Sequence, residues 1–213
     1  MNMTNKEIRK ITKIIDLLKR YYGIKTPAKQ NPFRVLISTV LSQRTRDENT
    51  KKATSLLFSK YKTINDIANA SEKELRKLIK SVGFYRQKAK SIKEISRILV
   101  EKYKGKVPKN FNELISLPRV GRKTANCVLV YGFGIPAIPV DTHVHRISNR
   151  IGLVKTKKPE ETEKELRKNV PKKYWVVLNH LLVIHGQTLC LAIRPKCERC
   201  PIKSVCKTGR HKL

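Results

Sequence analysis

The sequence predicts an all-α protein, and three observations support this prediction. Apolar residues recur every three or four positions along most of the 213 residues, as they do on one face of a helix. Recognisable start and stop signals flank these stretches, whereas the alternation that marks strands is missing. Because 39% of the residues are hydrophobic, the chain can bury a core. We expect about ten helices.

The first three predicted helices lie within the N-terminal third of the chain. Thr4 and Glu7 form a capping box at the start of the first helix. Asn31 and Pro32 open the second, because proline fits the first turn of a helix. The third covers residues 49–61. The apolar stripes of these helices comprise Ile8, Ile11, Ile15, Leu18 and Tyr22, then Phe33, Leu36, Ile37 and Val40, then Ala53, Leu56 and Leu57.

Two more helices are predicted before residue 100. Ser71 and Glu74 form a second capping box, and Gly83 is expected to end the helix that they begin. The helix after it contains a regular apolar stripe. Its members are Ala89, Ile92, Ile95 and Leu99.

The stretch 135–140 is expected to be extended but not to be a central strand. Pro136 and Pro139 would each remove a donor from a sheet ladder. This connector is therefore the best candidate for a domain boundary. Three helices are predicted after it. The first begins at Asp141 or Thr142 and ends at Gly152, and the second begins at Pro159. The third begins at Pro171 and ends at Gly186.

The charge of the chain points to a nucleic acid partner. Lys and Arg total 48 against 16 Asp and Glu, a formal net charge of +32. A Lys-rich composition adapted to heat normally raises Glu as well, and acids are scarce here. Each phosphate that a cation neutralises releases a counterion, which offsets the self-repulsion of such a protein.

The sequence also predicts where the chain works. Met1 is followed by polar and charged residues, so no secretion signal is visible, and no 18-residue apolar run predicts a membrane span. We therefore expect a cytoplasmic protein, associated with the nucleoid if the source is prokaryotic. In a reducing compartment disulfides are rare, so clustered cysteines are expected to bind metal.

Four of the five cysteines lie close together near the C-terminus: Cys190, Cys197, Cys200 and Cys206. Structural zinc sites generally repeat a Cys-x2-Cys pair, whereas this chain has that spacing once, flanked by gaps of six and five residues. Four thiolates also suit a [4Fe–4S] cluster. The spacing favours iron–sulfur and leaves zinc open. The fifth, Cys127, follows an apolar pattern and is expected to be a small buried side chain.

Residues 110–131 predict a helix–hairpin–helix motif. A short helix ends near Leu117, a tight turn covers Pro118 to Gly121, and a second helix begins at Arg122 or Lys123. The turn and the start of the second helix present backbone N–H groups that suit a phosphate. Such contacts position a protein on DNA without reading its sequence.

Lys123 and Asp141 each have two interpretations. Lys123 lies in the first turn of a helix, where it can contact a phosphate; nearby positive charge would also lower its pKa, as a Schiff-base nucleophile requires. Asp141 can be an ordinary N-cap or a catalytic carboxylate. His143 and His145 are two positions apart and cannot share a helix face, so we expect structural or DNA-facing roles for both.

Together these motifs resemble the endonuclease III family of DNA glycosylases, over about residues 30–206. Lys123, Asp141 and the loop with the four cysteines occur in the order found in the family and at compatible spacings. The matching segments are Leu117-Pro118, Val120-Gly121-Arg122-Lys123-Thr124-Ala125-Asn126, Val140-Asp141-Thr142-His143, the four cysteines, Leu41-Ser42-Gln43-Arg44-Thr45-Arg46-Asp47 and Gly83-Phe84-Tyr85.

The resemblance implies a helix–hairpin–helix DNA glycosylase fold with two helical domains and an active-site cleft between them. Residues 24–134 would form a six-helix barrel that carries the hairpin. Residues 1–23 and 135–213 would form a discontinuous domain that holds one [4Fe–4S] cluster on the four cysteines. We expect the cluster to position the protein on DNA and to take no part in bond cleavage.

The resemblance also implies base-excision repair of oxidised pyrimidines in duplex DNA by a monomer. Lys123 would displace the flipped base and form a Schiff base, Asp141 would assist, and β-elimination would then cut the strand. A mismatch-specific glycosylase acting on T·G or U·G pairs and a non-catalytic DNA-binding module remain alternatives. The expected DNA contacts are Gln43, Arg44, Phe84, Arg119, Val120, Gly121, Arg122, Thr124, His143, Arg194 and Lys196.

Two residues depart from the family pattern. Arg119 replaces the first glycine of the usual Leu-Pro-Gly-Val-Gly hairpin, and it is strained if that position has a positive φ. We expect altered hairpin geometry and retained function. Arg44 stands where well-known bacterial members carry a glutamine that fills the gap left by the flipped base. An arginine can fill that gap or simply contact a phosphate.

Overall fold

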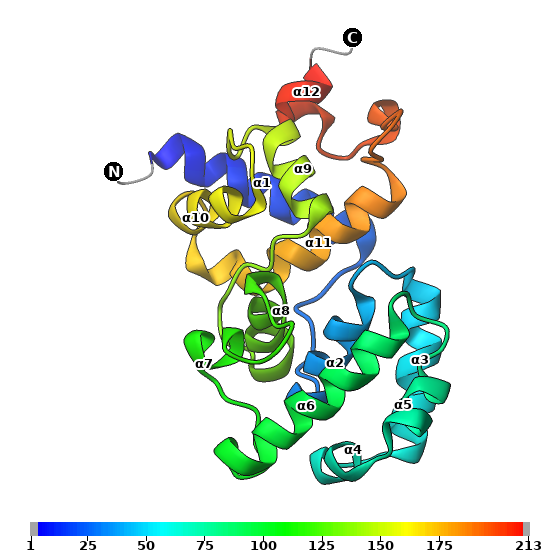
Figure 1. Ribbon diagram of the computed structural model, residues 1–213. Coiled ribbons are helices and arrows are strands. Elements are labelled where there is room, and N and C mark those ends of the chain that lie inside the picture. The colour runs from blue at the N-terminus through cyan, green and yellow to red at the C-terminus, as the bar shows by residue number, and fades with distance from the viewer. Residues whose placement is uncertain (1–3, 211–213) are drawn as a thin grey trace. The chain divides into compact units, whose positions relative to one another are not determined.

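The computed structural model of the protein describes residues 4–210 (Figure 1). Within that range the regular structure consists of 12 α-helices with short 3-10 and π segments, and no strand occurs there, so the all-α prediction is confirmed. No helix in the same range is long and apolar enough to cross a membrane. The chain divides into two compact units, an interior unit (Lys29–Phe133) and a terminal unit (Met1–Ala28 with Gly134–Leu213).

The interior unit is built around α2 (Pro32–Ser42). Asn31 caps this helix by accepting hydrogen bonds from the Phe33 and Arg34 amides, as the Asn-Pro signal predicts. Six of the eleven residues of α2 are buried, because the helix packs against α3, α6, α8 and η1. The other elements are α3 (Asp47–Lys60), α4 (Ile64–Asn69), α5 (Glu72–Leu78), α6 (Tyr85–Tyr103), α7 (Phe111–Ile115), α8 (Arg122–Cys127) and the π-helical η1 (Val128–Phe133).

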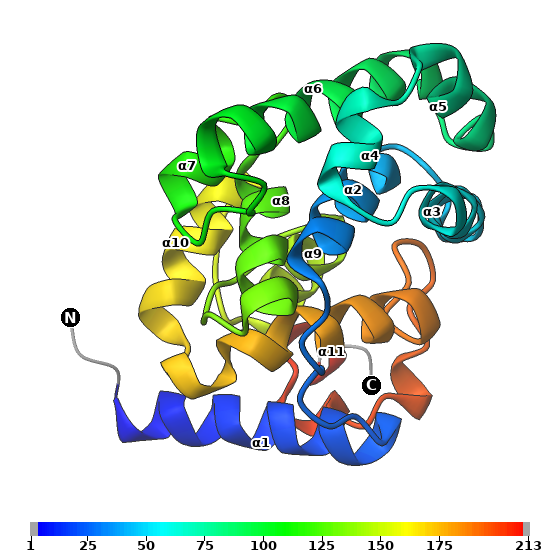
Figure 2. The ribbon, with the colours of Figure 1, turned by 90° about the horizontal axis from the view of Figure 1, so that it is seen from below.

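The terminal unit is built around α11 (Trp175–Thr188), which is apolar on most sides. The capping box of Thr4 and Glu7 starts α1 (Asn5–Tyr22) as predicted, and Figure 2 shows α1 lying along α11. Both helices contribute to one core with α9 and α10. The remaining elements are α9 (Thr142–Ile151), α10 (Pro159–Asn169), η2 (Lys172–Tyr174), η3 (Cys197–Arg199), η4 (Lys203–Val205) and α12 (Lys207–Arg210).

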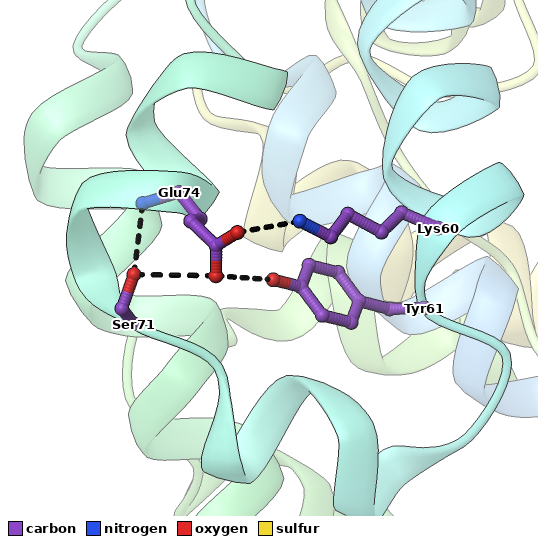
Figure 3. Close-up of polar contacts among 4 residues, drawn as sticks. All are labelled: Lys60, Tyr61, Ser71 and Glu74. Carbon is purple, nitrogen blue, oxygen red and sulfur yellow. Dashed lines mark hydrogen bonds and ion pairs between the residues drawn. The ribbon is translucent and has the colours of Figure 1, made fainter.

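The predicted capping box at Ser71 and Glu74 is only half formed. Ser71 accepts from the Glu74 amide, as expected, but the Glu74 carboxylate does not return to the Ser71 backbone. It binds Lys60 Nζ at 2.5 Å and the Tyr61 hydroxyl at 3.1 Å instead (Figure 3). A charged partner and a second donor thus compete successfully for this carboxylate. The contact links the end of α3 to α5.

Two predicted helix ends were wrong. The helix that starts after Ser71 ends at Leu78 with Ile79 as its C-cap, so Gly83 lies outside it. Gly186 lies inside α11, and the helix continues to Thr188. Gly186 is there for a packing reason, because a Cβ atom at this position would overlap His143 and lie 2.9 Å from Ile147 Cδ1. Its missing side chain lets α9 approach α11.

Gly186→Ala is expected to destabilise the protein, although alanine is the better helix former by about 1 kcal/mol. The overlap with His143 and Ile147 outweighs that gain and costs about 1–3 kcal/mol. Urea denaturation measures the change. Gly121→Ala is the matched control, because its added methyl meets no atom within 4 Å and its φ is −87°. A Gly186→Ala protein as stable as the wild type contradicts this explanation.

Candidate functional site

The hairpin of the interior unit forms as predicted, with one strained residue. The Val120 amide donates to Leu117 O at 3.1 Å, which closes a turn with Pro118 in its second position. Arg119 occupies the third position with a φ of 58°, the left-handed conformation that glycine adopts in type II turns. The expectation of strain at Arg119 is therefore confirmed. Its side chain donates to Gln87 Oε1 at 2.9 Å.

Lys123 is the second residue of α8, which starts directly after the hairpin. Its N-cap is Gly121, so no capping side chain occupies the start of this helix. Lys123 is partly exposed, whereas Val120 and Thr124 on either side are buried. The side chains of Val120 and Thr124 therefore pack inside the unit.

One other loop is bonded to the hairpin loop, and a third segment is bonded to that loop. Gln43 Nε2 donates to Arg119 O at 3.0 Å, which joins the loop after α2 to the turn. The Gly83 amide donates to Thr45 Oγ1 at 3.1 Å, which joins that loop to the start of α6. Exposed side chains project from this set of loops, including Arg44 and Phe84, whose side chain is 57% exposed. The structure thus brings three predicted DNA-contact segments together.

Lys88 lies beneath these loops and was not identified from the sequence. Only 2% of it is exposed, and Nζ donates to Leu41 O at 2.7 Å, Gln43 O at 2.5 Å and Thr45 Oγ1 at 2.9 Å. Burial, with a smaller contribution from the Arg119 cation, lowers the pKa of Lys88 to about 8. The ammonium form therefore predominates at neutral pH.

Positive φ values concentrate at the predicted DNA contacts. Five non-glycine residues in the described part of the chain have left-handed φ: Arg44, Phe84, Lys104, Arg119 and Arg194. Lys104 is simply the C-cap of α6. The other four were all selected from the sequence as DNA contacts. Strained backbone persists where the surroundings over-determine it, and such positions cluster at functional sites.

Asp141 belongs to the terminal unit, where it is the N-cap of α9. Its Oδ1 accepts from the Val144 amide at 2.8 Å, so the capping interpretation describes its position, and the bond also fixes the carboxylate. His143 packs against Gly186, and its Nδ1 lies 3.2 Å from an Arg146 nitrogen. His145 Nδ1 lies 2.6 Å from Thr162 Oγ1. Both histidines thus have structural partners.

The four C-terminal cysteines surround one pocket in the terminal unit. Cys190, Cys197, Cys200 and Cys206 all line it, and all four are free thiols. Burial raises the pKa of Cys200 to about 11. Across the described residues, no three or more His, Cys, Asp or Glu side chains are placed to hold a single metal ion. The four cysteines line a common space.

Several nitrogen atoms lie within hydrogen-bond distance of sulfur atoms in this pocket. Arg150 lies 3.6 Å from Cys190 Sγ, and the Gly209 amide lies 3.3 Å from Cys206 Sγ. His185 Nε2 lies 3.6 Å from Cys200 Sγ, and burial lowers the pKa of this histidine to about 4. Thiolates bound to a metal accept such hydrogen bonds. Arg150 and the Gly209 amide would therefore donate to Cys190 and Cys206 as thiolates.

Two arginines of α9 hold the loop between the first two cysteines. Arg146 donates to Cys190 O at 2.9 Å. Arg150 donates to Leu191 O at 2.6 Å and to Ala192 O at 2.7 Å. Arg194 and Lys196, further along the same loop, are exposed. The loop thus has a fixed base and a cationic outer surface.

Sequence reasoning missed Lys88, Arg146 and Arg150, although two signals were present. Lys88 is four residues before Ile92 and so occupies the apolar stripe of α6, where a cation needs a partner. Arg146 and Arg150 are four residues apart and share one face of α9. Neither signal indicates which carbonyl groups these cations bind, because those groups come from distant segments.

Comparison with known proteins identifies the family. Residues 37–172 match the HhH-GPD superfamily of base excision DNA repair proteins. Endonuclease III of Thermotoga maritima is 57% identical over 182 residues, which are 85% of each chain. A trapped endonuclease III–DNA covalent intermediate matches the structure with a TM-score of 0.86 and 38% identity, covering 99% of both chains.

A thermostable thymine-DNA glycosylase is also similar, with a TM-score of 0.83 and 26% identity over 95% of this chain and 98% of its own. The higher identities are with proteins named endonuclease III, and they extend over most of both chains. The chain therefore belongs to the endonuclease III family of base-excision-repair DNA glycosylases with AP lyase activity.

Proposed function

We propose that this chain removes oxidised pyrimidines from duplex DNA and cuts the strand at the resulting site, with Lys123 as the nucleophile. One observation carries the proposal: a partly exposed lysine stands in the first turn of the helix that follows a DNA-binding hairpin. A lysine so placed can contact a phosphate or attack a sugar. Membership in a family of combined glycosylases and lyases favours attack.

The reaction begins with the damaged nucleotide turned out of the duplex. The neutral amine of Lys123 attacks C1′, and the bond to the base breaks with its electron pair leaving on the base. The resulting amine adduct opens to an imine, which acidifies the hydrogens on C2′. Loss of one of these protons breaks the C3′–O bond and cuts the strand. Water then releases the sugar fragment and restores the amine.

Asp141 supplies the carboxylate in this proposal. Its N-cap bond to Val144 uses Oδ1 and holds the carboxylate in one orientation. The group accepts a proton from the attacking amine or stabilises the cationic sugar as the base departs. Capping and catalysis are thus compatible roles of one side chain.

The DNA contacts are proposed to come from both units. In the interior unit they comprise the backbone of the hairpin together with exposed Arg44, Phe84, Arg119 and Arg122. Arg44 fills the gap left by the flipped base, and Gln43 supports the hairpin. In the terminal unit Arg194 and Lys196 contact phosphates, and His143 lies near the backbone of the substrate.

We further propose that Cys190, Cys197, Cys200 and Cys206 hold one [4Fe–4S] cluster. The endonuclease III family generally contains iron–sulfur centres. The four residues line one pocket, and their thiolates would supply the four ligands that such a cluster takes. Zinc is a poorer fit, because structural zinc sites generally repeat the Cys-x2-Cys pair that occurs once here. The bound cluster would anchor the cationic loop, and no bond-breaking step involves it.

These assignments make the interior unit the barrel domain with the hairpin and the terminal unit the cluster domain. We propose that a single chain acts alone, in the compartment that holds the DNA. A mismatch-specific glycosylase is the second candidate, favoured by the likeness to a thymine-DNA glycosylase. Lys123 argues against it, because glycosylases of this superfamily that only remove the base lack a lysine at this hairpin position.

The wild-type protein is expected to be trapped covalently on an abasic duplex by borohydride, because reduction fixes the imine. Lys123→Ala should abolish trapping, while Lys106→Ala, which removes an exposed lysine of the same unit, should not. Base release should be faster from a thymine-glycol duplex than from a T·G duplex. Faster release from T·G favours the second candidate, and undiminished trapping by Lys123→Ala excludes this lysine as the nucleophile.

Asp141→Asn is expected to slow base release by about 10²- to 10⁴-fold, the range typical of a lost acid–base group. DNA affinity should change by no more than about threefold, because asparagine also caps helices and serves the fold. Single-turnover kinetics and fluorescence anisotropy measure the two quantities. If the rate of base release and the DNA affinity fell by the same factor, the Asp141 carboxylate would serve DNA binding and not the chemical step.

Replacing Arg194 and Lys196 together by alanine is expected to reduce the slope of log K against log salt by up to about 2, since each phosphate contact contributes about 0.9. The visible absorbance of the cluster and its content of about four iron atoms per chain should not change. These controls separate loss of cations from loss of the cluster. An unchanged slope removes this loop from the DNA contacts.

A further inference from the structure

We propose that Lys88 is a positioning residue, which holds the loop Gln43–Thr45 in the conformation that presents Arg44 to a damaged site in DNA. The inference rests on the proposed function, because it specifies how one of the proposed DNA contacts is prepared. Lys88 itself is buried and does not touch DNA. It acts through the backbone on either side of Arg44.

The ammonium group uses all of its hydrogen-bonding capacity on this loop. It has three N–H groups, and three oxygen atoms lie within 2.9 Å: Leu41 O, Gln43 O and Thr45 Oγ1. Leu41 is in the last turn of α2, where carbonyl groups lack partners within the helix. A cation is also favourable at this negative end of the helix dipole.

Burial of this cation is not explained by a gain in packing. Its three contacts are neutral oxygens, and the charged group that acts on its pKa is a second cation, Arg119. Burying an ammonium without an opposite charge is unfavourable, and an apolar side chain would fill the same space at lower cost. What an apolar side chain cannot do is hold three acceptors in fixed positions.

Those acceptors lie on both sides of Arg44. The hydroxyl of Thr45 donates to Gln43 O at 3.2 Å and accepts from both Lys88 and the Gly83 amide, so all its bonding positions are filled. Arg44 between them has a φ of 50°. A left-handed arginine persists only where its neighbours fix the backbone, and Lys88 binds both neighbours.

The same contacts connect Arg44 to the other two loops. Gln43 reaches the hairpin through its bond to Arg119 O, and Thr45 reaches the start of α6 through Gly83. A Cβ atom at Gly83 would lie 2.9 Å from Arg44 O, so these segments are also in close contact. Loss of the ammonium would therefore release the loop that carries Arg44 from its fixed place beside the hairpin.

The test uses Lys88→Met, which keeps the length of the side chain and removes its donors. Lys90→Met is the matched control, since it removes the same charge from an exposed position of the same helix. Affinity is measured for a duplex with a tetrahydrofuran abasic-site analogue and for the same duplex undamaged. Their ratio reports recognition of the damaged site, and 2-aminopurine opposite the analogue reports whether a side chain fills the gap.

Lys88→Met is expected to lose at least about tenfold of the preference for the abasic-analogue duplex, because hydrogen bonds to charged groups are strong. Affinity for the undamaged duplex should change by about twofold, as should both affinities of Lys90→Met. Because Lys88 acts through Arg44, adding Lys88→Met to Arg44→Ala should cause little further loss. The proposal is overturned if the losses of preference from Lys88→Met and Arg44→Ala multiply in the double variant. It is also overturned if Lys88→Met leaves the preference for the abasic-analogue duplex unchanged.

Should Lys88→Met not fold, Thr45→Val replaces it in the same cycle. Valine removes one acceptor of Lys88 and the bond to Gly83 while the ammonium stays. The expected result is a smaller loss of preference for the abasic-analogue duplex, which again adds little to the loss from Arg44→Ala. An unchanged preference, or losses that multiply in the Thr45→Val, Arg44→Ala double variant, overturns the proposal. Borohydride trapping by the wild type keeps the two ideas separate: its failure counts against the proposed function, whereas trapping with no effect of these variants counts against Lys88.

Discussion

Backbone carbonyl groups at helix ends need donors when they are buried, and in this protein basic side chains from other helices supply them. Lys88 of α6 binds Leu41 O at the end of α2. In the terminal unit Arg146 of α9 binds Gly186 O and Cys190 O around the end of α11. Lys10 of α1 likewise binds Ile151 O at the end of α9. Each contact fixes the position from which the next loop departs.

Because basic side chains bind carbonyl groups at helix ends, the many cations of this chain fall into two groups with different roles. Most of the cations are exposed and face solvent or a polyanion, where they act through long-range attraction. A few, among them buried Lys88 and half-buried Lys10, Arg146 and Arg150, act through hydrogen-bond geometry. The exposed class tolerates exchange, because a phosphate accepts bonds from many directions. The second class does not, because each N–H points to a particular oxygen.

Fixed loop ends also explain where the backbone is strained. Arg44, Arg119 and Arg194 follow or lie within loops whose carbonyl groups are held by distant side chains. A positive φ at an arginine is unfavourable, so the surrounding bonds must maintain it. The result is a long cationic side chain at a defined position on an otherwise adaptable loop. At the proposed DNA contacts, such an arrangement would lower the cost of ordering the side chain on binding.

The sequence determined the class of fold, most helix starts and the identity of the candidate chemical groups. Local signals suffice for these features, because caps, apolar periods and cysteine spacing act over a few residues. The Asn31–Pro32 and Thr4–Glu7 starts formed as expected for this reason. Residue type and spacing likewise identify Lys123, Asp141 and the four cysteines as candidates.

Only the tertiary structure decided which partners competed for each polar group. The Glu74 carboxylate binds Lys60 and Tyr61 and does not close the predicted capping box at the Ser71 backbone. Gly186 is a contact point between helices and not a helix end. The three oxygens that Lys88 binds belong to residues 43 to 47 positions earlier in the sequence. These outcomes depend on distances between segments remote in sequence, which no local pattern encodes.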